Sequence, residues 1–299
     1  MTVLELLQNN PSYLIIFCTI LGLLVGSFLN VVIYRIPVML QREWRQQCCE
    51  FLELDESTVS KEGTAETHKV FNLAKPESHC PKCNAPVRAW QNIPIISYLL
   101  LRGRCSTCNT SISIRYPIIE GLTGLLSALV AWQFGPTWLT LALLVLTWCL
   151  ISLTMIDFDH QLLPDNITIP LLWLGLVVNT LLPDAAVNPR DAVLGAVIGY
   201  LSLWSVYWVF KILTGKEGMG YGDFKLLAAL GAWMGWQPIL LIIILSSLVG
   251  AVVGIVMLVA LGRDRNVPIP FGPYLAGAGY IALLWGDSLM SVYLSALVN

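Results

Sequence analysis

The sequence predicts an all-α polytopic membrane protein with about eight transmembrane helices and one cytoplasmic, zinc-ribbon-like loop domain. Of its 299 residues, 56% are hydrophobic and only 12% are charged, and the mean hydropathy of +0.71 is far above that of ordinary soluble domains. Several apolar runs are long enough to cross about 30 Å of hydrocarbon as a helix, which takes roughly 20 residues. Lipid is therefore an expected partner, and the net charge of −2 gives no reason to expect nucleic acid.

The apolar runs define the predicted spans. We place them at 12–36, 116–134, 137–156, 167–182, 191–213, 223–237, 238–261 and 273–295. The fourth and sixth runs are short, so they need tilt, local thinning of the bilayer or burial among other helices, and counts of seven or nine spans stay open. The predicted domains are an N-terminal transmembrane helix at 1–36, a cytoplasmic domain at 37–115 and a second transmembrane domain at 116–299.

The basic residues predict the orientation, because Lys and Arg accumulate in cytoplasmic loops. With eight spans and an external N-terminus, every Lys and Arg except Arg190 lies on the cytoplasmic side, including Arg263 and Arg265 near the end of the chain. We expect no cleavable signal peptide, since residues 1–11 lack a basic region and the first apolar run has the length of a span.

Four cysteines in the loop domain predict a metal site. Cys80, Cys83, Cys105 and Cys108 form a C-x2-C-x21-C-x2-C pattern, and two intervening residues let each pair point both sulfurs at one ion. Disulfides do not persist in the cytoplasm, so we favour structural Zn²⁺ over a redox role or free thiols. The other four cysteines receive no function: Cys18 and Cys149 lie in spans, and Cys48 and Cys49 are adjacent.

Between the two cysteine pairs lies the apolar stretch "AWQNIPIISYLLLRGRC", residues 89–105. It is too short to cross a bilayer and too apolar for a solvated loop. We therefore expect it to lie along the membrane interface or to pack onto the spans.

Acidic side chains at membrane depth are costly, about 3 kcal/mol on the insertion scale, and so they indicate function. The sequence offers Glu120 in the second span, Asp157, Asp159 and Asp165 in "MIDFDHQLLPDN", and Asp223 at the start of the sixth. For Glu120 we favour a helix-start acid or an interhelical hydrogen bond. For Asp165 we favour a cap of the fourth span, because "PDNIT" is typical of a helix start.

The predicted topology brings Asp157 and Asp223, 66 positions apart, to one face at similar depth. Two carboxylates that approach closely share one proton, so one acts as a base on water and the other as an acid to a carbonyl, which is aspartyl protease chemistry. Gly220 and Gly222 lack Cβ atoms and would let a substrate backbone approach, so Gly220, Tyr221 and Gly222 form the expected substrate cleft. The alternative is that Asp223 only caps a helix.

"GYGDFKLL" and "IDFDHQLLPD" resemble the GxGD aspartyl peptidases of the type IV prepilin peptidase family, and the likeness covers nearly the whole chain. "GLLVGSFLNVVIYRIP", "CPKC…CSTC", "RYPIIE" and "PIPFGPYLAGAG" also match. The resemblance implies a bacterial inner-membrane enzyme with its active site and cysteine loop in the cytoplasm. It would remove the leader of type IV prepilins and type II secretion pseudopilins and then N-methylate the new N-terminus from S-adenosylmethionine.

The resemblance also implies that Asp157 and Asp223 are catalytic, and the second transmembrane domain then holds the peptidase. Asp159 is the rival of Asp157, but the family's acid lies seven residues before the proline, here Pro164. His160 is expected to be solvated or interfacial rather than a general base.

The methyl donor site has no sequence signature, because no G-x-G-x-x-G follows a strand. We look for it in the cytoplasmic loop and in "GSFLN" (26–30), with Gly103 permitting close backbone approach. The glycines at 22 and 26 and at 195 and 199 also have the spacing of close helix contacts.

Two other functions stay open. A proton-coupled transporter would use Asp157, Asp159 and Asp223 as a relay on discontinuous helices near mid-bilayer. A non-catalytic pilus or secretion assembly factor would use the cysteine loop to bind a partner.

Overall fold

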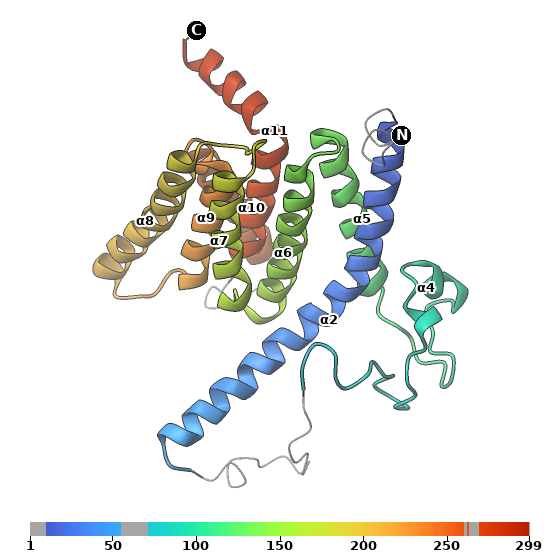
Figure 1. Cartoon of the computed structure of the whole chain (residues 1–299). Coiled ribbons are helices and arrows are strands. Elements are labelled where there is room, and N and C mark those ends of the chain that lie inside the picture. Colours follow the sequence, from blue (N-terminus) through green and yellow to red (C-terminus); the bar gives the residue numbers. More distant parts are fainter. Residues whose placement is uncertain (1–9, 55–70, 260–261, 263–268, 299) are drawn as a thin grey trace. The chain divides into compact units, whose positions relative to one another are not determined.

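The computed structural model describes residues 10–54, 71–259, 262 and 269–298, and its regular structure is helical (Figure 1). Arg263 and Arg265, which the predicted orientation places on the cytoplasmic side, lie outside the described residues. The long helices are α2 (Pro11–Phe51), α5 (Arg115–Phe134), α6 (Trp138–His160), α7 (Asp165–Leu181), α8 (Pro189–Thr214), α9 (Tyr221–Met234), α10 (Ile239–Val259) and α11 (Gly272–Val298). A 3-10 turn η1 (Ala89–Asn92) and the short helix α4 (Ile96–Leu100) lie in the loop domain.

Each of the eight predicted spans corresponds to one of these long helices. Among the described residues, five helices are long and apolar enough to cross a membrane: α2, α5, α6, α8 and α10. The helix α7 is apolar but shorter, and α9 has only 14 residues. The polytopic helical class is therefore confirmed, while the number of eight spans stays a prediction.

The chain divides into two compact units. Unit 1 comprises the described parts of Met1–Thr19 and Leu125–Asn299, and unit 2 comprises those of Ile20–Gly124. Both acids of the predicted pair belong to unit 1, whereas the four cysteines belong to unit 2. Each chemical site is thus built within one unit.

The helix α9 forms the centre of unit 1, in contact with α7, α8 and α11. In Figure 1 it lies between α7 and α8. At about 1.5 Å per residue its 14 residues reach roughly 21 Å, short of a bilayer core. Its side chains are nonetheless almost all buried in protein, from Asp223 to Met234. Burial among other helices, one of the options for this short run, is therefore what the structure shows.

Small residues allow α8 to approach α9 closely. A Cβ at Gly199 would lie 2.7 Å from the carbonyl oxygen of Leu227, and Gly195 and Gly231 face each other backbone to backbone. At the C-terminal end of α9, Asn179 of α7 donates hydrogen bonds to the carbonyl oxygens of Ala232 and Trp233. The predicted helix-packing role of Gly195 and Gly199 is confirmed.

The helix α2 continues beyond the predicted end of the first span at residue 36. Pro37 lies inside it, and the helix ends at Phe51. The extension is polar, and its side chains pair one turn apart, Gln46 with Glu50 and Gln47 with Glu43. These local pairs stabilise a solvated continuation that hydropathy alone does not reveal.

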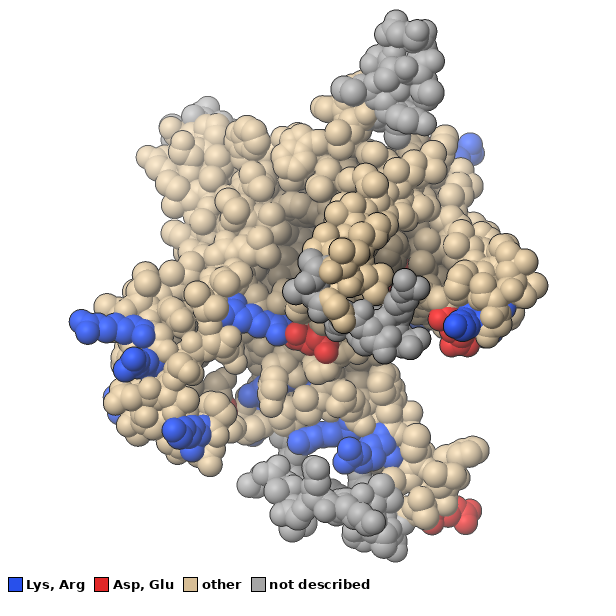
Figure 2. Space-filling view, turned by 180° about the vertical axis from the view of Figure 1, so that it is seen from behind, with Lys and Arg blue, Asp and Glu red and all other residues tan. Residues whose placement is uncertain are grey.

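The outer faces of the long helices are apolar, as expected of helices in contact with lipid. Large hydrophobic side chains such as Ile20, Leu24, Leu248 and Ile255 are more than half exposed. On the face shown in Figure 2, charged side chains are few and most of the surface is uncharged.

Candidate active site and metal centre

Asp157 lies in the last turn of α6 and is buried, with 5% of its surface exposed. Its Oδ2 accepts a hydrogen bond from the backbone N–H of Gly272, the first residue of α11, at 2.9 Å. The first N–H groups of a helix have no acceptor within the helix. This carboxylate therefore occupies the N-terminal end of α11, where the helix dipole also favours an anion.

Asp223 lies in the first turn of α9 and is equally buried, with 6% exposed. The N-cap of α9 is Gly220, so Asp223 is not the N-cap residue that the alternative supposed. Its backbone N–H bonds to the carbonyl of Gly220 at 3.2 Å, while its Oδ1 is buried without a hydrogen-bond partner among the described residues. A buried carboxylate oxygen without a partner is costly, so its presence indicates a function.

The two acids lie close enough for their charges to interact. The side chain of Leu163 joins the segments that carry them. A Cβ at Gly222 would meet Leu163 Cβ at 2.7 Å, and a Cβ at Gly272 would meet Leu163 Cδ2 at 3.2 Å. The glycine before Asp223 and the glycine that binds Asp157 therefore both pack against one leucine.

The polar residues that follow Asp157 in the sequence are exposed, unlike Asp157 and Asp223. Asp159 and His160 are exposed, because Asp159 is roughly 200° around the helix from Asp157. His160 thus lies at the surface as expected. Asp165 is not the N-cap of α7, which is Pro164. Instead, both of its oxygens accept from Lys225 Nζ, at 2.6 and 2.7 Å.

The three residues of the expected substrate cleft directly precede Asp223 in the chain. Gly220 and Tyr221 are exposed and Gly222 is half-buried, immediately before the buried Asp223. The preceding loop is held by an ion pair of 2.8 Å between Lys211 and Glu217. The helices α6 and α9 run unbroken through their acids, unlike the discontinuous helices that the transporter hypothesis requires.

The four predicted ligands come together in unit 2. The sulfurs of Cys80, Cys83, Cys105 and Cys108 all lie within 4.8 Å of one another. The two pairs have the same turn: Cys80 N–H bonds to Ala85 O at 2.9 Å, and Cys105 N–H bonds to Thr110 O at 2.8 Å. Isolated antiparallel bridges flank both turns, His79 with Pro86 and Arg104 with Ser111. This repeated turn is typical of zinc knuckles.

These residues fit a tetrahedral ion. Four thiolates at about 2.3 Å from one Zn²⁺ have their sulfurs about 3.8 Å apart, and Cys80 Sγ lies 3.7 Å from Cys108 Sγ. The hydrogen bond with the side chain of Thr110 lowers the pKa of Cys108 to about 6, which favours the thiolate. Burial and the neighbouring thiols raise the pKa of Cys83 to about 11, so the cluster does not favour four thiolates without an ion. The remaining cysteines, Cys18, Cys48, Cys49 and Cys149, are outside this cluster.

Glu120 has the structural role that the sequence favours. It is buried in α5, and its Oε2 accepts the backbone N–H of Ile95 at 2.8 Å. Ile95 immediately precedes α4 and has a φ of 58°, which is rare for a β-branched residue. The carboxylate therefore holds a strained backbone position at the start of α4, within the apolar stretch.

Gly103 ends the turn after α4. It is buried with a φ of 67°, its N–H bonds to Tyr98 O at 2.9 Å, and a Cβ there would lie 2.9 Å from Tyr98 Oη. The turn alone thus requires glycine.

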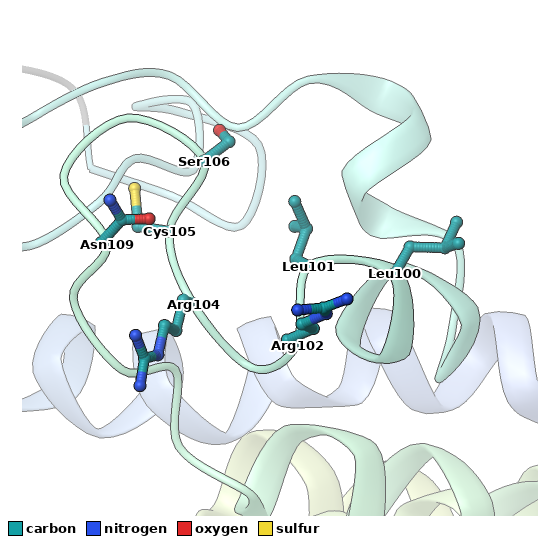
Figure 3. A pocket seen from close by; sticks show the side chains of 7 residues that line it. All are labelled: Leu100, Leu101, Arg102, Arg104, Cys105, Ser106 and Asn109. Atoms are coloured by element: carbon teal, nitrogen blue, oxygen red, sulfur yellow. The ribbon is translucent and has the colours of Figure 1, made fainter.

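Beside Gly103 lies a cavity of about 510 Å³, and Figure 3 shows its lining. The lining residues are Leu100, Leu101, Arg102, Arg104, Cys105, Ser106 and Asn109. A second cavity, of about 430 Å³, lies between Asn179 and Pro189, and neither includes the acid pair.

Sequence reasoning missed Gly272 as part of the site. The signal was the Phe-Gly-Pro sequence at the start of the last helix, but Gly272 is 115 positions from Asp157.

Fold and site together define a polytopic helical membrane protein with two buried acids and a cluster of four cysteines that could hold a metal ion. The chain belongs to the type IV leader peptidase family: that family model matches residues 144–255, and the bacterial peptidase A24 N-terminal domain matches residues 20–134. No solved structure matches the chain.

Several relatives are similar over nearly the full chain. A prepilin leader peptidase/N-methyltransferase of Stutzerimonas stutzeri is 57% identical over 294 residues, 98% of each chain. Proteins of the same name are 53% identical in Pseudomonas aeruginosa, over 98% of each chain, and 56% identical in Neisseria gonorrhoeae, over 90% of each chain.

Proposed function

We propose that this chain is an aspartyl endopeptidase that removes prepilin leader peptides and then N-methylates the new N-terminus, with Asp157 and Asp223 as the catalytic pair. The observation that carries the proposal is the burial of two carboxylates whose charges interact, one with an unpartnered oxygen, in a chain similar throughout to prepilin leader peptidases. Type II secretion pseudopilins are proposed as further substrates.

The pair supplies both halves of peptide hydrolysis. One carboxylate takes a proton from water as the water oxygen bonds to the scissile carbonyl carbon, and the other acid gives its proton to the carbonyl oxygen. When the tetrahedral intermediate breaks, the C–N bond cleaves and the leaving nitrogen receives a proton from the pair. Close carboxylates suit this task because they hold one proton between them.

The orientation follows from charge. Lys211, Lys216 and Lys225 lie at the end of the helices that carries the acid pair, and basic loops face the cytoplasm. A prepilin has a basic leader followed by an apolar helix that lies in the bilayer. We therefore place the cut at the cytoplasmic surface of the bacterial inner membrane, beside Gly220, Tyr221 and Gly222.

We test the pair with Asp157→Asn, Asp223→Asn and Asp159→Asn in the purified full-length protein, scoring leader removal from a prepilin in detergent. Each of the first two should lower kcat by at least about a hundredfold, since general acid–base catalysis typically contributes that much or more. Asp159→Asn should cleave normally. Full cleavage by both of the first two variants would refute the pair, and a dead Asp159→Asn would indicate the wrong aspartate of α6.

We propose that Zn²⁺ fills the four-cysteine site and has a structural role, because four thiolates leave no position for substrate. For the methyl donor, S-adenosylmethionine, we propose the cavity beside Gly103. Its volume of about 510 Å³ is in the usual range of ligand pockets, and Arg102 and Arg104 offer partners for the donor's carboxylate.

A Gly103 variant would not test the donor site, because its turn requires glycine. Instead, Arg102→Gln and Arg104→Gln should weaken photocrosslinking of labelled S-adenosylmethionine while leaving leader cleavage unchanged. The exposed Arg88, which does not line the cavity, provides the control as Arg88→Gln. Unchanged labelling in both cavity variants would place the donor elsewhere.

A further inference from the structure

The N-terminal end of α11 contacts Asp157 of the acid pair through a single backbone N–H group. Gly272 is the first residue of the helix, and its N–H lies 2.9 Å from Asp157 Oδ2. Pro273 follows and has no N–H to offer. The N–H groups of Tyr274 and Leu275 both bond to Phe271 O. Among the N–H groups of this turn, the one that binds the carboxylate of Asp157 is therefore that of Gly272.

The contact also requires the absence of a side chain. A Cβ at Gly272 would lie 2.7 Å from Asp157 Oδ2 and 3.2 Å from its Cγ. Real Cβ atoms essentially never approach a neighbour that closely, so any other residue must displace the carboxylate or the helix end. Glycine is needed here for space, since its φ is not positive.

We propose that Gly272 is a positioning residue of the peptidase, whose N–H fixes the carboxylate of Asp157 toward Asp223. The proposal rests on the catalytic pair proposed above. An N–H bond to a carboxylate favours its ionised form and fixes its rotation. Because a misplacement of about 1 Å can cost a hundredfold in rate, small shifts of this group matter.

The central experiment compares Gly272→Ala with Gly277→Ala in the full-length protein. Both add one methyl to α11, but nothing lies within 4 Å of a Cβ at Gly277. We expect Gly272→Ala to lower kcat for leader cleavage at least tenfold with KM within twofold of wild type, because substrate binding does not use this contact. Methylation of a pre-cleaved pilin should stay at wild-type level in both variants, and thermal unfolding in detergent should show that unit 1 remains folded. Wild-type kcat in Gly272→Ala would overturn the proposal.

A second variant distinguishes two causes of a lower kcat: displacement of the Asp157 carboxylate and crowding against Leu163. The added methyl would also touch Leu163 Cδ2 at 3.2 Å, and Leu163→Val removes that atom. If the loss comes from Asp157, Gly272→Ala/Leu163→Val stays at least tenfold slower than Leu163→Val alone. If the second change restores kcat, crowding against Leu163 is the cause and the proposal fails. The catalytic pair is judged separately, by the asparagine variants.

Discussion

At the scale of single residues, burial separates acids that the sequence places side by side. Asp157 is buried, as is Asp223, while Asp159 is exposed on the other side of the helix that carries Asp157. The choice of Asp157 rested on a family resemblance and its distance from Pro164. The structure supports that choice on an independent ground, because only a buried carboxylate can share a proton with Asp223 in this site.

Glu120 gives a prediction at this scale. Glu120→Gln keeps an oxygen that can accept the N–H of Ile95, whereas Glu120→Ala leaves that N–H without its partner. The unpaired group should cost about 1–3 kcal/mol, and it should loosen the segment 93–103. Hydrogen exchange of that segment should therefore be faster in Glu120→Ala and near wild type in Glu120→Gln. Equal exchange in both variants would show that the hydrogen bond does not hold the segment.

Single positions also show what sequence alone misses. The glycine pair at 195 and 199 was predictable, because its spacing is local. The partner of Asp165 was not, because Lys225 is 60 positions away and reaches it only through the packing of α7 against α9. The local helix-start pattern therefore predicted a helix cap at Asp165, whereas in the folded chain Asp165 forms an ion pair with Lys225.

At the scale of elements, this ion pair joins the first turns of α7 and α9, and Lys225 lies two residues after Asp223. Its side chains are 30% and 52% exposed, so we expect a coupling of up to about 1 kcal/mol, not more. A double-mutant cycle with Lys225→Ala and Asp165→Ala, measured by thermal unfolding in detergent, should give that value, decreasing as salt rises.

Lys216→Ala, in the loop before α9, is the control and should leave the stability unchanged. A coupling near zero at low salt would mean that packing alone aligns the two helices. In that case the exchange of charges, Lys225→Asp with Asp165→Lys, should not recover any stability lost by either single change.

The boundaries and surroundings of the helices also show what hydropathy alone cannot predict. The runs at 167–182 and 223–237 were recognisable as apolar, and both are helices. That α9 would be encased by α7, α8 and α11 was only one option among three, because hydropathy does not distinguish lipid from protein surroundings. The extension of α2 to Phe51 was missed because its stabilising pairs are polar.

At the scale of the whole molecule, the metal site and the acid pair belong to different units. Cys108→Ser should abolish the expected content of about one zinc per chain. Because Cys105 is both a proposed metal ligand and part of the cavity lining, methyl transfer should be lost as well. Leader cleavage should decrease less, since unit 1 builds the acid pair by itself. Elemental analysis and the two activity assays provide the measurements.

The exposed Cys48, outside the cluster, provides the matched control as Cys48→Ser and should retain both the metal and methylation. Zinc retained in Cys108→Ser, or cleavage lost as completely as methylation, would contradict the independence of the two sites.

Because α9 is short and enclosed by other helices, we expect the active site to tolerate changes in bilayer thickness. The depth of Asp223 is set by contacts with neighbouring helices and not by the match of α9 to acyl chains. A change in lipid chain length acts on the outer helices first. The spacing of the two acids should therefore be preserved in thin and thick membranes alike, so that one enzyme can serve a cell whose lipids change with temperature.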